Sequence, residues 1–190
     1  MNKAGRTVLA LSLVLGLTAM ILLIMGRSWW CKGASLVPWS WDIWSMHNSQ
    51  HLLDAYTFSH LQHGLVFYGL FFLLLRRQQR SSRFILAMAL EASWEILENT
   101  PMIIQRYREA TISLDYFGDT ILNSLSDILA CAAGFGLAAF LPAWSSVSLF
   151  ALVEAVMLIT IRDSLIINII MLIAPVDTVR NWQMSGRPVP

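Results

Sequence analysis

The chain has 190 residues, of which 56% are hydrophobic and only 13% are charged. A soluble globular domain carries roughly twice that charged fraction, and the apolar residues here form long blocks without the alternation of a water-facing surface. The formal net charge of +1 excludes the basic field that attracts nucleic acid. We therefore expect one integral membrane domain over residues 1–190, surrounded by membrane lipid and with no nucleic acid partner.

The first apolar block, residues 8–25, follows two basic residues, as in a secretory signal. However, it is uncharged throughout and long enough to span a membrane. The residues after it include Trp29 and Trp30 and contain no small-x-small cleavage pattern. Bulky Trp30 also precedes Cys31, where a lipoprotein acceptor needs a small residue. The sequence predicts a retained transmembrane helix.

Cys31 lies in a tryptophan-rich segment, whereas Cys131 lies inside a later apolar block. If that block spans the membrane, the two sulfur atoms are too far apart to form a disulfide. The chain therefore has no disulfide framework.

Four further segments complete a predicted bundle. The apolar run 65–75 covers only roughly 17 Å of a hydrocarbon core about 30 Å thick, so its helix must extend back to Ser59. Residues 164–174 are apolar but too short to span, and Pro175 ends them. We expect a re-entrant or interfacial helix there, followed by a polar tail over 175–190. The predicted fold is an all-α, polytopic transmembrane helical bundle with spans over residues 8–25, 59–75, 84–100, 119–141 and 147–162.

Positive charge predicts the orientation. Four arginines between positions 76 and 83 crowd the link between the second and third spans, with no acidic residue among them. The positive-inside rule places this link, and with it the N-terminus, in the cytoplasm of a bacterium with an inner membrane. Segments 29–56 and 100–118 then face the periplasm.

Polar side chains interrupt the second to fifth spans at a common depth, about 18 to 28 Å from their cytoplasmic ends. The glutamates of the third span and the polar residues of the fourth each recur on one helix face. Lipid cannot solvate such groups, so we expect them to line a polar pocket open to the periplasm. The candidate catalytic residues are His60, His63, Glu95 and Glu98, and the candidate ligand-binding residues are Asp119, Asn123, Asp127 and Arg162.

Three kinds of chemistry fit this set. Two histidines one turn apart with neighbouring carboxylates are adequate ligands for zinc or another divalent metal, although no HExxH spacing favours one, so the cofactor stays unknown. Without a metal, Arg162, Arg106 and Arg108 could hold a lipid-linked or anionic small-molecule ligand, while a histidine and a glutamate act as acid and base. A proton-coupled carrier uses similar residues.

Each candidate also has a structural interpretation. The two histidines could bond to backbone or lipid headgroups, and the glutamates could pair with Arg162 or a histidine. Asp127 and Asn123 could form interhelical hydrogen bonds that hold the third and fourth spans together. The tryptophans of residues 29–44 are typical of an interfacial aromatic belt, with a sugar-stacking platform as the alternative.

Four segments of the chain resemble a known protein family. They are residues 91–101 (EASWEILENTP), residues 115–127 (DYFGDTILNSLSD) and the segments beginning at Ile161 and Asn181. They resemble signature blocks of a family of uncharacterised multi-pass inner-membrane proteins of alphaproteobacteria, a domain of unknown function. The resemblance implies a location in the cell membrane and no established activity.

A weaker resemblance is to VanZ-type membrane proteins. The Asp119-x-x-x-Asn123 pattern opening an apolar helix is similar to theirs, although the glycine that usually follows is absent. This likeness suggests envelope lipid or peptidoglycan biology.

We therefore predict a multi-pass inner-membrane protein with a buried polar site facing the periplasm, an enzyme or binding protein acting on an envelope lipid. The alternatives are a small proton-coupled carrier and a non-catalytic membrane scaffold. The sequence leaves the oligomeric state open.

The predicted topology can be tested with single cysteines in a cysteine-free background. A membrane-impermeant thiol reagent applied to spheroplasts should label positions next to Trp41 and Tyr107 but not next to Gln79. The reason is that the arginine-rich link holds Gln79 in the cytoplasm. The reverse labelling pattern would overturn the orientation.

Overall fold

The computed structural model describes residues 2–33 and 35–187. Its regular structure within those residues consists of helices and one pair of two-residue parallel strands, which confirms the predicted all-α class. The helices are α1 (Lys3–Ile24), α2 (Thr57–Leu74), α3 (Arg80–Glu98), α4 (Pro101–Ala110), α5 (Ile121–Phe140), α6 (Ala143–Ile161), α7 (Leu165–Ile173) and α8 (Asp177–Met184). The strands are β1 (Trp39–Ser40) and β2 (Leu53–Asp54).

Three helices, α1, α5 and α6, are long and apolar enough to cross a membrane, judged by length and composition. Helix α1 buries only Thr18 and Leu22, so most of its apolar surface is exposed. Such a surface suits contact with lipid. Helices α2 and α3 have comparable lengths, but histidines and glutamine in α2 and charged residues in α3 lower their hydropathy. Composition thus supports three of the five predicted spans.

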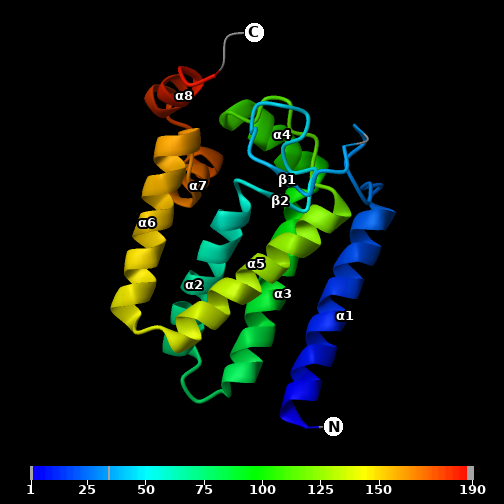
Figure 1. The fold of residues 1–190 in the computed structure, drawn as a ribbon, viewed down its shortest axis with the longest axis vertical. Helices are drawn as coiled ribbons and strands as arrows, with labels where there is room; N and C mark the ends of the chain where they lie inside the picture. The colour runs from blue at the N-terminus through cyan, green and yellow to red at the C-terminus, as the bar shows by residue number, and fades with distance from the viewer. Residues whose placement is uncertain (1, 34, 188–190) are drawn as a thin grey trace.

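The five long helices run side by side, with α1 and α6 on opposite flanks of α2, α3 and α5 (Figure 1). Helix α1 packs on α3, and α6 packs on α2. The N-terminus and the α2–α3 and α5–α6 links lie at one end of the bundle (Figure 1). The strands and the short helices α4, α7 and α8 lie at the other end, so the polar loops and the short helices gather on one side.

Helix α7 turns back after α6 because a buried carboxylate caps it. Glu154 of α6 accepts hydrogen bonds from the backbone N–H groups of Leu165 and Ile166, at 3.1 and 3.4 Å. Gln62 of α2 donates to the same carboxylate at 3.0 Å. The negative charge also suits the positive end of the helix dipole. One acidic side chain therefore joins α2, α6 and α7.

The C-terminal residues differ from the expected polar tail, because residues 177–184 form helix α8. Its Gln183 is buried and donates to the Arg162 carbonyl at 2.9 Å and to Asp163 at 3.2 Å. The polar side chains of the tail therefore hold a helix against the end of α6.

Helices α2 and α5 approach so closely that only glycine fits at two points of contact. A Cβ added at Gly64 would lie 2.1 Å from the Cys131 carbonyl oxygen, and one at Gly134 would lie 1.9 Å from the Leu61 carbonyl oxygen. Small residues of this kind let membrane helices pack backbone to backbone.

We expect Gly64→Ala and Gly134→Ala each to reduce stability by about 2 kcal/mol or more, because neither carbonyl can move away without shifting a helix. Gly69→Ala and Gly136→Ala are matched controls, since an added Cβ meets nothing within 4 Å there. Thermal unfolding in detergent checks the comparison. Equal stability of all four variants would contradict this packing.

Candidate functional site

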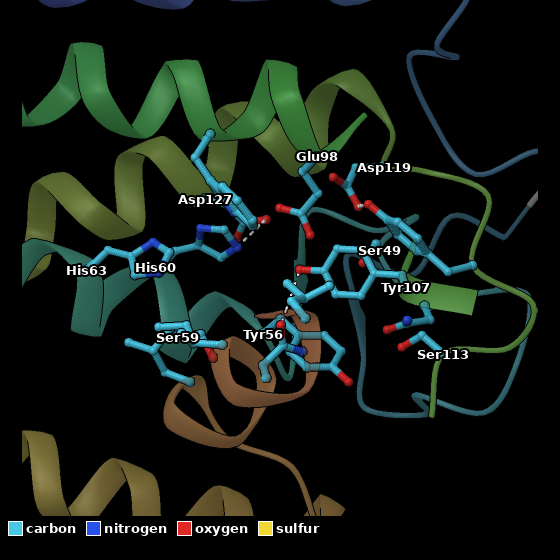
Figure 2. Close-up of a pocket in the computed structure, with 17 residues that line it drawn as sticks. Ser49, Tyr56, Ser59, His60, His63, Glu98, Tyr107, Ser113, Asp119 and Asp127 are labelled. Carbon is cyan, nitrogen blue, oxygen red and sulfur yellow. Dashed lines mark hydrogen bonds and ion pairs between the residues drawn. The ribbon is translucent and has the colours of Figure 1, made fainter. Parts of the chain in front are cut away.

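A histidine of α2 lies between carboxyl groups from two other helices. His60 Nδ1 lies 2.6 Å from Glu91 Oε1 and 3.3 Å from Glu95 Oε1, both of α3. On its other side, His60 Nε2 lies 3.9 Å from Asp127 Oδ2 of α5. All four side chains are buried. Figure 2 shows the His60 imidazole directed toward Asp127.

Glu91 also binds the second histidine. His63 Nδ1 lies 3.0 Å from each carboxylate oxygen of Glu91. The rings of His60 and His63 meet edge to face, with centroids 5.2 Å apart. Glu91 thus holds both imidazoles by their Nδ1 atoms. In the neutral form of His60 that donates from Nδ1 to Glu91, Nε2 carries the lone pair and can act as a base or a metal ligand.

These groups border a pocket of about 70 Å³, which holds a few water molecules or one small polar group. Five of the predicted site residues line it, namely His60, His63, Glu98, Asp119 and Asp127. Polar residues that the sequence did not single out complete much of its wall, namely Asn48, Ser49, Tyr56, Ser59, Tyr107, Ser113, Tyr116 and Asn168. Its apolar wall consists of Trp94 of α3 and Leu165, Ile169 and Leu172 of α7.

Two predicted residues lie behind the pocket wall instead of lining it. Glu95 does not line the pocket, but its carboxylate lies 3.3 Å from His60 Nδ1 and within 4.8 Å of the Glu98 carboxylate, both of which belong to pocket residues. Asn123 donates to Asp54 Oδ2 at 3.4 Å, while the other oxygen of Asp54 accepts from the backbone N–H groups of Tyr56 and Thr57 at the start of α2. Asn123 therefore ties α5 to the segment that begins α2, whereas the interhelical interpretation expected a bond to the third span.

Asp119 anchors the end of the pocket nearest α4. It accepts hydrogen bonds from Asn99 Nδ2 and from the Tyr116 hydroxyl, each at 2.9 Å, and its backbone N–H donates to Asn99 Oδ1 at 2.8 Å. These bonds join the end of α3 to the start of α5. The sequence predicted Asp119 but missed Asn99 and Tyr116.

Arg162 lies apart from the pocket, so the expected pairing with a carboxylate is not observed. Helix α6 ends at Ile161, and Arg162 adopts a left-handed conformation with φ 54°. Its guanidinium donates to the Trp182 carbonyl at 3.0 Å and to the Ser185 hydroxyl at 2.5 Å, both on the α8 side. The depth predicted for Arg162 requires α6 to continue as a regular helix, whereas the left-handed turn at Arg162 directs its side chain toward α8.

The adjacent acid, Asp163, is the buried group at this corner. It accepts from the Tyr56 hydroxyl at 3.1 Å, from Asn168 Nδ2 at 3.3 Å and from Gln183 at 3.2 Å. Its own backbone neighbour Ser164 donates at 2.9 Å. Because Tyr56 and Asn168 line the pocket, Asp163 positions two residues of its wall.

The pocket is acidic and has no strong cation in its wall. Among the described residues that line it, none is lysine or arginine. Arg106 donates to the Leu172 carbonyl at 2.8 Å, and Arg108 donates to the Tyr116 carbonyl. Both arginines thus bind backbone carbonyls, and among the described residues the basic partners of the buried carboxylates are His60 and His63.

Two overlapping groups of side chains could hold a metal ion. His60, His63 and Glu91 form one, and His60, Glu95 and Glu98 form the other, with ligand atoms within 4.8 Å of one another in each. Both groups need His60, so one ion would occupy one of them at a time. Imidazole and carboxylate ligands suit zinc and similar divalent ions.

Burial raises the pKa of Asp119 from its usual value of 3.8 to about 6. The folded protein therefore binds this proton more tightly than the unfolded chain. The stability due to Asp119 is full below about pH 4 and is lost as the pH rises through about 6. We expect the melting temperature of wild type to fall relative to Asp119→Asn over this range, measured in matched buffers. A constant difference between the two proteins across the range would contradict the raised pKa.

The chain matches one protein family over most of its length. Residues 22–185 match the family model described as a protein of unknown function, DUF2585. A UPF0314 protein of Sinorhizobium fredii is 48% identical over 96% of this chain and 94% of its own length. One from Paracoccus denitrificans is 47% identical, covering 91% and 90% of the two chains. One from Sphingopyxis alaskensis is 40% identical, covering 91% and 92%.

No solved structure matches the chain. The likeness to an uncharacterised alphaproteobacterial family, expected from the stretches around Glu91 and Asp119, is confirmed by these relatives. The family model and the relatives cover most of the chain, including both of those stretches. The chain belongs to the DUF2585 family, together with the UPF0314 proteins that it resembles.

Proposed function

We propose that this protein crosses the bacterial inner membrane five times, with the N-terminus in the cytoplasm and the pocket on the periplasmic side. The arginine-rich α2–α3 link lies at the same end of the bundle as the N-terminus (Figure 1), in agreement with the positive-inside rule. Helices α2 and α3 complete the five spans. Their polar residues His60, Glu91 and Glu95 face the interior, where lipid does not need to solvate them.

Within this bundle, the pocket acts as the catalytic site of an enzyme that modifies an envelope lipid. The observation that carries this proposal is the buried pair of His60 and Glu91, 2.6 Å apart, at the wall of the pocket. Glu91 accepts the Nδ1 proton and so fixes the tautomer and orientation of the ring. The Nε2 atom can then remove a proton from a hydroxyl group or a water molecule of the substrate.

The pocket walls suit a lipid with a polar headgroup. Trp94, Ile169 and Leu172 offer an apolar surface, whereas histidine, carboxyl and tyrosine groups line the remainder. Since none of the described residues that line the pocket is arginine or lysine, a bare phosphate or carboxylate would lie beside Glu98, Asp119 and Asp127 without a fixed cation to balance its charge. The charge therefore favours a headgroup rich in hydroxyl or amino groups over the anionic ligand expected from the sequence. A divalent ion held by His60 would extend the choice to phosphates.

A small proton-coupled carrier is the second candidate. Within residues 2–33 and 35–187, Glu95 Oε1 and Asp127 Oδ1 are buried without a hydrogen-bond partner. Buried carboxyl groups in this state can bind and release protons along a pathway. Proton movement into liposomes that depends on Glu95 and Asp127 would favour this candidate over the enzyme.

We expect His60→Gln and Glu91→Gln to reduce activity by about 100-fold or more, because each removes the oriented base. The measurement is the envelope lipid profile of a deletion strain complemented with each variant, alongside protein abundance in membranes. Glu109→Gln is the matched control, since Glu109 is exposed on α4. Both variants should accumulate normally and leave the deletion profile uncorrected. If they accumulate and restore the lipid profile fully, the catalytic proposal fails.

A further inference from the structure

A second cluster of metal-ligand side chains lies outside the acidic pocket, in the segment between α1 and α2. Cys31 Sγ lies 3.3 Å from His47 Nδ1, and His51 Nε2 lies 3.1 Å from the same nitrogen. The three ligand atoms all lie within 4.8 Å of one another. Cys31 and His51 are buried, and His47 is half-buried. The cluster shares no residue with the His60 site.

The outer side of His51 is arranged as in a metal-bound imidazole. Its Nδ1 atom donates to the Val37 carbonyl oxygen, so the lone pair of Nε2 faces Cys31 and His47. A histidine that binds a metal usually donates its other ring N–H in this way, which fixes the tautomer and the ring. The indole of Trp30 meets the His51 ring edge to face at 5.7 Å and holds it further in place.

The backbone between the two histidines is bent to bring them together. Ser49 adopts a left-handed conformation with φ 58°, which is uncommon for a residue with a side chain. Across the cluster, a Cβ added at Gly33 would lie 3.2 Å from His47 Cε1 and 3.5 Å from Cys31 Sγ. The backbone at Gly33 therefore passes close to both ligands.

We propose that Cys31, His47 and His51 bind a zinc-class transition metal ion, with the fourth position open to water or another ligand. In tetrahedral zinc sites, Zn–N bonds of about 2.0 Å and Zn–S bonds of about 2.3 Å separate neighbouring ligand atoms by about 3.3 to 3.5 Å. The separations at His47, 3.1 and 3.3 Å, match a set of ligands that needs little movement to close on an ion.

Hydrogen bonding alone satisfies this cluster poorly. Since His51 Nδ1 donates to Val37, the neutral ring presents a lone pair at Nε2. A single proton on His47 Nδ1 can then be donated to either Cys31 or His51, which leaves one of its two neighbours without that bond. A metal ion serves all three ligands once Cys31 has released its thiol proton.

The spacing agrees with this assignment. His47 and His51 are separated by three residues, within the range found for paired histidines in zinc sites. Asn48 and Ser49 lie between them and line the acidic pocket. An ion at Cys31 would therefore stabilise one wall of that pocket, without taking part in chemistry at His60.

The test is to load full-length protein in detergent with cobalt(II), a spectroscopic substitute for zinc. The Cys131→Ser variant keeps Cys31 as its single thiol, because the chain has two cysteines. It should bind cobalt with a thiolate-to-metal charge-transfer band, and zinc should displace the cobalt and abolish the band. Cys31→Ser should lack the band, and His47→Gln should weaken binding by at least about 100-fold.

Retention of the band in Cys31→Ser, or its absence from a folded Cys131→Ser protein, would overturn the site. If Cys31→Ser does not fold, the spectra of Cys131→Ser and His47→Gln decide whether the site binds metal. His47 is only half-buried, so its replacement disturbs the fold less. Glu91→Gln should leave the band unchanged. Loss of the lipid activity in Glu91→Gln with the band intact would separate the two sites, and failure of either proposal would leave the other standing.

Discussion

The contact between His60 and Glu91 joins α2 to α3, the two long helices that composition does not mark as membrane spans. Burying a carboxylate or an imidazole is expensive unless a partner satisfies it, and in this chain the partner comes from a different helix. His60 and His63 of α2 and Glu91 of α3 satisfy one another at 2.6 to 3.0 Å. This interaction brings the polar face of each helix inward and leaves apolar residues such as Val66 and Leu90 on the outside. The pocket exists because these faces meet.

A second buried acid, Glu154, also finds its partners on other helices and so positions one wall of the pocket. Glu154, a charged residue in one of the most apolar helices, caps α7 and accepts from Gln62. Capping fixes α7 where its apolar residues Leu165, Ile169 and Leu172 close one side of the pocket. Buried acids thus have two uses here, in capping and in the pocket. Under the proposed function, the carboxyl groups of the pocket, with no arginine or lysine among its described lining residues, would favour neutral or cationic groups or a metal ion.

The sequence predicted which polar residues belong to the site better than it predicted the residues that they contact. Helical spacing placed Glu91 with Glu95 and Asp119 with Asp127, because a face of a regular helix follows from the period alone. Of the predicted site residues, five line the pocket, while Glu95 and Asn123 lie behind its wall. Arg162 was expected to pair with carboxylates, but a left-handed residue ends α6 and turns its side chain toward α8. Such a break depends on tertiary contacts, which no period reveals.

The positions of residues in irregular segments were harder to predict from the sequence. Tyr56, Asp54 and Asn99 come from helix ends and loops, where position depends on contacts far apart in the sequence, such as the bond from Asn123 to Asp54. The cluster of Cys31, His47 and His51 was also missed, since the surrounding tryptophans were interpreted as an aromatic belt. The three-residue gap between His47 and His51 was a signal that a search for metal-ligand spacing would have found.

The central claim is that the oriented imidazole of His60 meets a lipid headgroup in a pocket open to the periplasm. The most direct measurement is a high-resolution electron cryomicroscopy map of the protein in nanodiscs made from native inner-membrane lipid. Our account predicts headgroup density within about 3.2 Å of His60 Nε2, with acyl chain density along Trp94 and α7. Lipid density confined to the outer faces of the helices, with Nε2 of His60 bonded only to protein groups, would contradict it.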